Sequence, residues 1–336
     1  MEFTGGGLLK VRITGSDVGK RVSVRYATHA SGTGAAFADA VGVLASWDAG
    51  VLVITRRTGE SVRIAESALV AGKVVPPAPA RRRGPAASFE ELARVTARAW
   101  EPVESEALGG WTLRAAAGFT RRANSALPLG DPGLPLDDAL ERVRDWYAAR
   151  GLPAYVQAAT GAAGTQELLC AELERRGWTR EMSAQVQTGG LAPVADLDAD
   201  VSAVRLDRGL DEQWLRRYQR FGVPGPHVLQ VLHSGPSVWF ASVPGTGSIP
   251  AAIGRCVVDG RWAGFMAVEV DPEHRRKGLA TAVMTALARR ALDEGASAAW
   301  LQVESENGGA RAMYAGMGFE VHHHYHHYRA GEDGRG

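Results

Sequence analysis

The segment from Phe265 to Asp293 joins an apolar run, a proline, a basic turn with a glycine, and a second apolar pattern. The run Phe265–Val270 predicts a strand, and apolar residues from Leu279 onward recur at the spacing of a helix with one apolar face. The first turn of such a helix has backbone N–H groups without intrahelical partners and about half a positive charge. Three basic residues stand directly before the bare backbone of Gly278: Arg275, Arg276 and Lys277. The pattern therefore predicts a strand, turn and helix whose turn binds an anion such as pyrophosphate.

Composition narrows the class of protein. The 336 residues predict roughly two to three domains. With 38 Lys and Arg against 37 Asp and Glu, the formal charge is +1, so no whole-chain field attracts nucleic acid or an anionic membrane. Cys170 and Cys256 lie far apart, which excludes a disulfide framework or a CxxC metal site and favours a reducing compartment. No apolar run reaches the roughly 20 residues that span a bilayer, so we expect a cytoplasmic protein without a membrane partner.

Residues 76–88 predict an extended linker, because they hold four prolines and three adjacent arginines without apolar periodicity. Residues 1–75 instead carry short β-branched segments separated by turn residues: Leu9–Thr14, Arg21–Tyr26, Val41–Trp47, Val51–Arg57 and Ser61–Ile64. Five strands without a helix resemble an SH3-like barrel. Fold alone leaves its role open, and we favour packing or a dimer contact over peptide binding. The chain is accordingly expected to be a monomer or a homodimer.

Residues 89–196 and 197–330 show the same order of helix and strand patterns, which predicts two copies of one α/β unit. Two pairs of glycines mark equivalent helix ends in the two copies: Gly151 with Gly295, and Gly177 with Gly318. Residues 331–336 are expected to form a flexible tail. The expected fold class is α/β, with tandem lobes preceded by a small all-β barrel.

Two motifs in the second copy resemble the Gcn5-related N-acetyltransferases. Val268 to Thr281, Val-Glu-Val-Asp-Pro-Glu-His-Arg-Arg-Lys-Gly-Leu-Ala-Thr, looks like their acyl-CoA signature, in which Arg-x-x-Gly-x-Ala lies between a strand and a helix. Trp300 to Phe319 looks like their second signature, a strand, Asn307, and a helix with Tyr314 before Gly-Phe. Together the motifs cover roughly residues 200–330. The resemblance implies a mixed central sheet with flanking helices, and acetyl-CoA as co-substrate of an N-acetyltransferase.

The resemblance also implies roles for the matching residues. The strand Val268, Glu269 and Val270 would hold the pantetheine arm and the reacting carbonyl oxygen through its backbone, where it splays from the next strand. The cofactor-binding turn would surround the pyrophosphate: Arg275, Arg276, Lys277, Gly278, Leu279, Ala280 and Thr281. Asn307 would contact the cofactor near the thioester. Tyr314 would protonate the leaving CoA thiolate, although it could instead belong to an apolar core cluster.

An amine acceptor must lose a proton before it attacks the thioester, so a base or a water chain is required. Many relatives carry a glutamate on the strand before the asparagine, but Gln302 stands there and cannot titrate. Glu304 shares its strand face and is a substitute candidate, as is Glu269 on the earlier strand. Water relayed to solvent is an equal alternative, and we expect no metal.

The first copy differs at the turn. Leu129 to Asp138 contains three acidic residues and no basic residue, which repels pyrophosphate. We therefore expect residues 89–196 to form a degenerate lobe without a CoA site. His322 to His327 holds five histidines around Tyr325. We expect a strand that lines the acceptor pocket, with an ordinary exposed strand or a metal site as alternatives.

The leading hypothesis is an acetyl-CoA-dependent N-acetyltransferase that works by direct attack in a ternary complex. Its acceptor is either a small-molecule amine or a protein lysine or N-terminus. The alternative from another class is a CoA-binding regulatory protein that docks through the barrel. A nucleic-acid module acting through Arg81 to Arg83 is the least favoured. Chains that join an SH3-like barrel to a Gcn5-related domain resemble actinobacterial proteins described as histone-type acetyltransferases.

Overall fold

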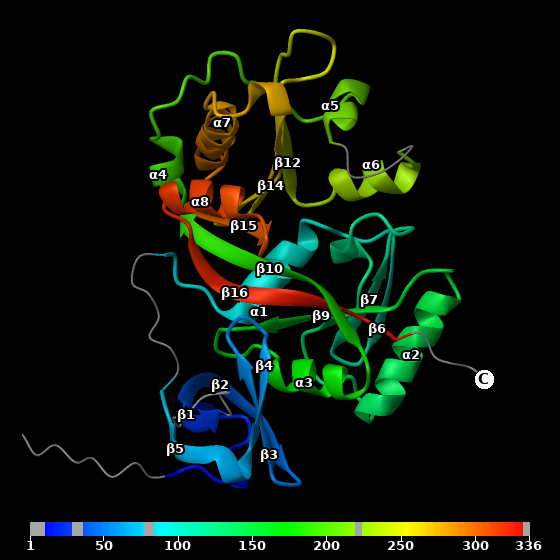
Figure 1. The fold of residues 1–336 in the computed structure, drawn as a ribbon. Helices are drawn as coiled ribbons and strands as arrows, with labels where there is room; N and C mark the ends of the chain where they lie inside the picture. Colours follow the sequence, from blue (N-terminus) through cyan, green and yellow to red (C-terminus); the bar gives the residue numbers. More distant parts are fainter. Residues whose placement is uncertain (1–10, 29–35, 77–83, 219–223, 332–336) are drawn as a thin grey trace, which may run out of the picture. The chain divides into compact units, whose positions relative to one another are not determined.

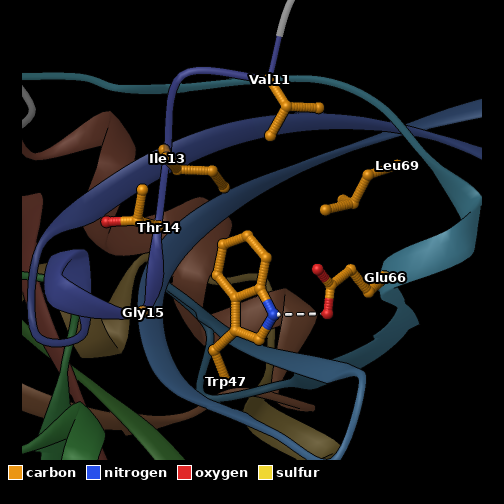
Figure 2. Close-up of a pocket in the computed structure, with 7 residues that line it drawn as sticks. All are labelled: Val11, Ile13, Thr14, Gly15, Trp47, Glu66 and Leu69. Carbon is orange, nitrogen blue, oxygen red and sulfur yellow. Dashed lines mark hydrogen bonds between the residues drawn. The ribbon is translucent and has the colours of Figure 1, made fainter.

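A computed structural model describes residues 11–28, 36–76, 84–218 and 224–331 (Figure 1). The chain separates into two compact units, residues 1–80 with 158–179, and residues 81–157 with 180–336. Some predictions lie outside the described residues: Leu9 and Lys10 of the first strand, residues 77–83 of the linker with Arg81 to Arg83, and residues 332–336 of the tail. No helix of the described chain is long and apolar enough to cross a membrane.

The first unit contains a five-stranded antiparallel sheet in the order β4-β3-β2-β1-β5. Its strands are β1 (Arg21–Thr28), β2 (Ala36–Asp48), β3 (Val51–Arg56), β4 (Ser61–Ala65) and β5 (Leu69–Val74). Alternate residues point inward and form its core, as half-buried strands require. The core residues include Val22, Val24, Leu44, Leu52, Ile54 and Ile64. The predicted small all-β domain is therefore confirmed.

One predicted strand of this unit is wrong. Among the described residues of Leu9–Thr14, only Val11 forms an isolated bridge, to Gly72, and the fifth strand is β5. The sequence pattern missed β5 because Gly72 interrupts its apolar residues. That glycine is required by packing, since a Cβ on it would lie 2.9 Å from the side chain of the buried Ile13.

Helix α3 (Glu167–Arg175) also belongs to the first unit and contacts β2 and β3. Thr160, at the end of β9 (Tyr155–Thr160), donates through its hydroxyl to the Arg57 carbonyl at 2.8 Å. Leu168 of α3 reaches the turn at Gly19, where a Cβ would lie 3.9 Å from its methyl carbon. Part of the first α/β copy is thus packed on the small sheet.

The second unit is built on an eight-stranded sheet in the order β11-β12-β13-β14-β15-β10-β16-β9. The strands not yet given are β10 (Thr179–Gly190), β11 (Arg205–Asp207), β12 (Ser237–Val243), β13 (Ala252–Asp259), β14 (Trp262–Val270), β15 (Ala298–Glu304) and β16 (Glu320–Arg329). A smaller sheet contains β6 (Glu104–Leu108), β7 (Trp111–Ala115) and β8 (Leu127–Pro128), and a parallel bridge between Ala126 and Val156 links its last strand to β9.

The strand order reveals the internal repeat. In the repeat, β9 corresponds to β15 and β10 to β16, because each pair follows an equivalent glycine. Yet β10 pairs with β15 and β16 lies beside β9, so each copy places its closing strand next to the other copy's strand. In Figure 1 these two long strands cross the middle of the second unit together. The two copies therefore complete one another's sheets.

The helix ends confirm the same correspondence. Gly151 and Gly295 both have positive φ, and the next residue donates its N–H back five residues, at 3.0 Å in each copy. Gly177 and Gly318 repeat this arrangement at the next helix, with bonds of 3.0 and 3.1 Å. These are left-handed helix caps, which favour glycine because it has no Cβ.

Helices cover both faces of the sheet in the second copy. The helices of this unit are α1 (Phe89–Arg98), α2 (Leu136–Ala148), α4 (Leu191–Ala195), α5 (Glu212–Arg217), α6 (Pro226–Leu232), α7 (Leu279–Asp293) and α8 (Gly308–Gly316). Phe265 and Leu301 pack with α4 and α7 in one cluster, whereas Trp262 and Trp300 pack with α1, α5 and α6 in another. We call the second side the α1 face. Alternation along β14 and β15 separates the two clusters.

Helix α1 is fixed to the second copy by Glu91. Its carboxylate accepts a hydrogen bond from Trp262 Nε1 at 2.8 Å and from Arg261 Nη2 at 2.7 Å. These donors, the indole first, hold the pKa of Glu91 below its ordinary value. Ser88 caps the helix by accepting from Glu91 N at 3.1 Å.

Candidate active site

Strands β14 and β15 separate along their length. They pair in parallel only from Trp262 with Ala298 to Phe265 with Leu301, although β14 continues to Val270. Over the remaining residues β15 stays with β10, and Glu304 pairs with Ala184. In the described part of the chain, the edge of β14 that carries Val268 and Val270 has no strand partner on the β15 side. This opening lies where the resemblance to the Gcn5-related N-acetyltransferases implies that the strands splay.

A β-bulge lies at the start of the opening. Ile253 of β13 pairs with Glu269, whereas Arg255 pairs with Met266, so β14 has one extra residue. Ala267 takes φ of 52°, an uncommon conformation for a residue with a side chain. The Asp271 N–H donates to Ala251 on the β13 side at 2.8 Å. Alternation then turns the N–H groups of Val270 and Val268 toward the opening.

The turn after β14 is supported by Asp271. Its Oδ1 accepts from Glu273 N at 2.9 Å and caps the short helix η4 (Pro272–His274). Its other oxygen pairs with Arg217, whose Nε donates to the Pro250 carbonyl at 2.7 Å. The backbone bond from Glu273, followed by Arg217, keeps the pKa of Asp271 below its ordinary value. The sequence reasoning missed this support, although Asp-Pro before a helix is a capping signal.

Helix α7 begins and ends at the predicted residues, Leu279 and Asp293. Gly278 caps it with φ of 78°, and a Cβ there would find no atom within 4 Å, so the space above the turn is open. The three cations before it are exposed, and in the described parts of the chain none forms an ion pair: Arg275, Arg276 and Lys277. The turn thus presents positive charge and free backbone N–H groups to solvent.

The corresponding turn of the first copy is closed. Gly109 and Gly110 fill it, since a Cβ on Gly110 would lie 2.7 Å from the backbone of Gly130. Asp131 is exposed and accepts from Gly133 N at 2.7 Å, and two acidic residues occupy the first turn of α2. Backbone and acid therefore occupy the place that is open and basic in the second copy.

Asn307 and Tyr314 are both on α8, beyond the end of β15. The Asn307 Oδ1 accepts from Ala310 N at 3.1 Å and caps the helix, which leaves the side-chain amide as the group able to reach a ligand. Tyr314 is half-buried against the cluster that contains Val268 and Leu301, and its ring lies 6.1 Å from that of Phe319. Tyr314 is thus on the α7 side of the opening and also contacts the core.

The candidate general bases lie on the α1 face, opposite the side that holds Tyr314. Leu301 and Val303 join the cluster of Tyr314, so the alternate residues Gln302 and Glu304 face the α1 face with Trp300. Glu304 is exposed, whereas the Gln302 side-chain oxygen is buried without a hydrogen bond in the described structure. Glu269 is half-buried and opposite Ile253. The structure therefore brings Glu304, and not Tyr314, to the α1 face.

The histidine segment forms β16, as predicted, but the expectation of an ordinary exposed strand is wrong. Strand β16 lies between β10 and β9, and its residues from His323 to Tyr328 are buried. The Nδ1 of His326 is 2.8 Å from the Ser183 hydroxyl, and burial lowers its pKa to about 3. No group of three or more potential metal ligands occurs among the described residues.

Comparison with known proteins gives two family matches. Residues 86–328 match a model described as "Probable histone acetyltransferase Rv0428c C-terminal", and residues 16–73 match "Rv0428c N-terminal Sm-like domain". The N-terminal sheet is therefore described as Sm-like, close to the predicted SH3-like fold.

Two relatives and a solved structure resemble the chain. The chain is 30% identical over 310 residues to "Probable histone acetyltransferase Rv0428c" of Mycobacterium tuberculosis, covering 91% of this chain and 93% of that protein. It is 26% identical over 247 residues to "Uncharacterized N-acetyltransferase YobR" of Bacillus subtilis, covering 70% and 97%. A GCN5-related N-acetyltransferase structure from Kribbella flavida has a TM-score of 0.53 at 16% identity, covering 74% and 97%, and shows the shared fold.

Proposed function

The chain belongs to the acetyltransferase family of the matching C-terminal model, within the Gcn5-related N-acetyltransferases, and we propose that it transfers an acetyl group from acetyl-CoA to an amine by direct attack. The observation that carries the proposal is the contrast between the two turns. The open, basic turn at Gly278 follows a strand with a free edge, whereas the equivalent turn at Asp131 is filled and acidic.

The second copy suits the chemistry of the co-substrate. Pyrophosphate oxygens accept hydrogen bonds from the free N–H groups that begin α7, and the cations around Arg276 add charge. The free edge of Val268 and Val270 offers hydrogen bonds to the amide-rich pantetheine arm. Acetyl-CoA supplies the activated thioester when it is bound. A backbone N–H at the bulge then stabilises negative charge that develops on the thioester oxygen.

Two side chains are assigned to proton transfers on opposite sides of β15. Tyr314 protonates the departing thiolate from the α7 side, and the Asn307 amide contacts the co-substrate beside it. Glu304, or water held near it, accepts the proton of the amine on the α1 face. This separation allows both substrates to occupy the opening together, as direct transfer requires.

The acceptor class is a separate question. The name of the Mycobacterium tuberculosis relative contains "histone", which suggests a protein lysine, whereas the Bacillus subtilis relative is named only as an N-acetyltransferase. A small-molecule amine fits the same chemistry. The barrel could then serve as a packing or contact module.

The test combines binding with turnover. Calorimetric titration with acetyl-CoA should show one site per chain, and a panel of amines and lysine peptides should release CoA thiol in its presence. Binding without turnover for any amine would support the regulatory alternative. Absence of acetyl-CoA binding would contradict the assignment of the turn.

A further inference from the structure

Arg122 lies on the α1 face with its charge unpaired. It belongs to a short helical turn, η3 (Arg121–Ala123), and its Nε donates to the Tyr325 hydroxyl at 2.8 Å. Within the described residues no carboxylate pairs with it, and its two terminal amino groups have no acceptor and reach solvent. Its neighbour Arg121 is instead paired with Glu181 at 3.0 Å.

Aromatic rings hold the Arg122 guanidinium in place. Its central carbon lies 5.7 Å from the ring centroid of Trp100 and 5.8 Å from that of Tyr325, and both rings are buried. Rings within about 6 Å of a guanidinium attract its positive charge and help to hold the group, while its amino groups stay available. A half-buried arginine so arranged is suited to bind a carboxylate with two hydrogen bonds.

Trp100 connects Arg122 to the opening between β14 and β15. The same ring lies 5.2 Å from the guanidinium of Arg255, which is fully buried. Arg255 Nη1 donates to the Ala99 carbonyl at 2.9 Å and lies 2.6 Å from the sulfur of Met266, next to the bulge. Arg122 therefore lies one indole ring away from the residues that pack behind the bulge.

A second path leads from Arg122 to the end of β15. Glu304 pairs with Ala184 on β10, and the next residue on β10, Ser183, bonds to His326 beside Tyr325. Glu304 and Tyr325 are thus two strands apart at a similar level, or roughly 10 Å. Both paths place Arg122 on the side of β15 where Glu304 is assigned to accept the proton of the amine.

Arginines outnumber carboxylates around Tyr325, which feels the charges of Arg122, Arg114 and Glu304. Arg114 is buried, acts electrostatically on Tyr325 and His327, and bonds to Ser125 and Gln157 rather than to a carboxylate. Burial lowers its pKa to about 10, so it stays charged at neutral pH. Burial, followed by the charges of three arginines, including Arg122, lowers the pKa of His327. An anion is favoured here, and a cluster of lysines is disfavoured.

We propose that Arg122 binds a carboxylate of the acetyl acceptor, so that the acceptor is a small amine with a carboxylate several bonds from its nitrogen. The proposal rests on the function proposed above and names its substrate class. Arg122 is then a specificity-determining residue, which selects the acceptor and holds its amine at the opening. A peptide rich in lysine lacks the matching charge.

A series of amine acceptors of increasing length tests the proposal. Thiol release from acetyl-CoA is measured with ω-amino carboxylates of increasing length, from glycine to 6-aminohexanoate, each beside the alkylamine of equal length. For one chain length, the wild type should have a kcat/KM about 10- to 100-fold higher for the amino carboxylate than for the alkylamine of equal length. This is the change expected when a hydrogen bond to a charged group is gained. Arg122→Gln should remove this preference while the acetyl-CoA affinity stays unchanged. Arg122→Lys should recover only part of it.

Arg121→Gln is the matched control, because Arg121 is adjacent, equally charged and already paired with Glu181. It should keep the preference. An equal loss of activity on both amines in Arg122→Gln would mean a structural role and overturn the proposal, as would better turnover of lysine-rich peptides. If no amine turns over, calorimetry with N-acetyl-6-aminohexanoate and CoA decides. Binding that Arg122→Gln abolishes supports the carboxylate site, and absence of binding contradicts it. If acetyl-CoA itself does not bind, that result contradicts the proposed function rather than the carboxylate site.

Discussion

The two turns that follow β8 and β14 occupy the same place in the repeat and have opposite character. At Gly278 the backbone is open and three cations are exposed, whereas near Gly133 the backbone of Gly109 and Gly110 fills the turn and Asp131 is exposed beside it. The two glycines have nearly the same φ, 78° and 76°. The two glycines thus share their φ, although Gly278 is the N-cap of α7 and Pro135 is that of α2. The surrounding side chains and the facing hairpin add to the difference.

The helices after β9 and β15 show the same contrast. Trp178 N bonds to the Leu173 carbonyl as Phe319 N bonds to the Tyr314 carbonyl, at 3.0 and 3.1 Å. Leu173 therefore stands where Tyr314 does and has no hydroxyl. The first copy retains the helix cap but has neither the anion turn nor the phenol. The two copies share the scaffold, and the second copy has the exposed basic turn and the phenol.

Removal of the first copy should have the largest effect. A chain of residues 197–336 lacks β10 and α1, so β15 loses a strand partner and the cluster around Trp300 loses its cover. We expect it not to fold, as measured by circular dichroism and size exclusion. Co-expression with residues 1–196 should recover a complex. A folded monomer of residues 197–336 would show that the exchanged strand is dispensable.

Gly278→Glu should weaken acetyl-CoA binding by about 100-fold or more, because it places negative charge where the pyrophosphate is assigned. Gly133→Glu is the matched control. It imposes the same residue at nearly the same φ in the first copy, and it should leave acetyl-CoA affinity unchanged. Calorimetry measures both variants, and thermal unfolding checks that their stabilities fall equally. Equal acetyl-CoA affinities in the two variants would contradict the assignment of the cofactor to the turn at Gly278 alone.

Tyr314→Phe should lower kcat by about tenfold or more with little change in acetyl-CoA affinity. A general acid contributes at least this much, and a thiolate leaves more easily than most groups. The substitution removes only the hydroxyl, so that position 314, like the equivalent Leu173 of the first copy, has no hydroxyl. Single-turnover kinetics measure the effect. Unchanged turnover would assign Tyr314 to the core alone.

Glu91→Gln should have the smallest effect, a small loss of folding stability. Glu91 connects α1 of the first copy to Arg261 and Trp262 of the second. The lowered pKa means that the charged carboxylate stabilises the fold fully above its ordinary value of 4.5, and that this stability is lost as pH falls through the lowered value. The side chain is 37% exposed, so we expect a loss of about 1 kcal/mol or less at neutral pH. Urea unfolding at neutral and acidic pH should show the difference shrinking with acid. A constant difference would exclude the charge as its cause.

Local signals made much of the fold predictable. The start and end of α7, the order of elements in the two copies and the glycine caps follow from short-range spacing and from φ preferences, which neighbours in sequence largely determine. The strand at His322 to His327 was predicted for the same reason. Its burial was not, because histidine patterns alone do not indicate which strands flank them.

The sequence by itself determined that a strand, a basic glycine turn and a helix follow one another at Gly278, and that a related but acidic unit precedes them. Only the tertiary structure decided that β10 and β16 are exchanged, that the Asp131 turn is filled by Gly110, and that the rings of Trp100 and Tyr325 lie beside Arg122. The reason is physical. Helix caps and charge runs depend on residues a few positions apart, whereas strand order, burial and an unpaired charge depend on which distant segments pack together.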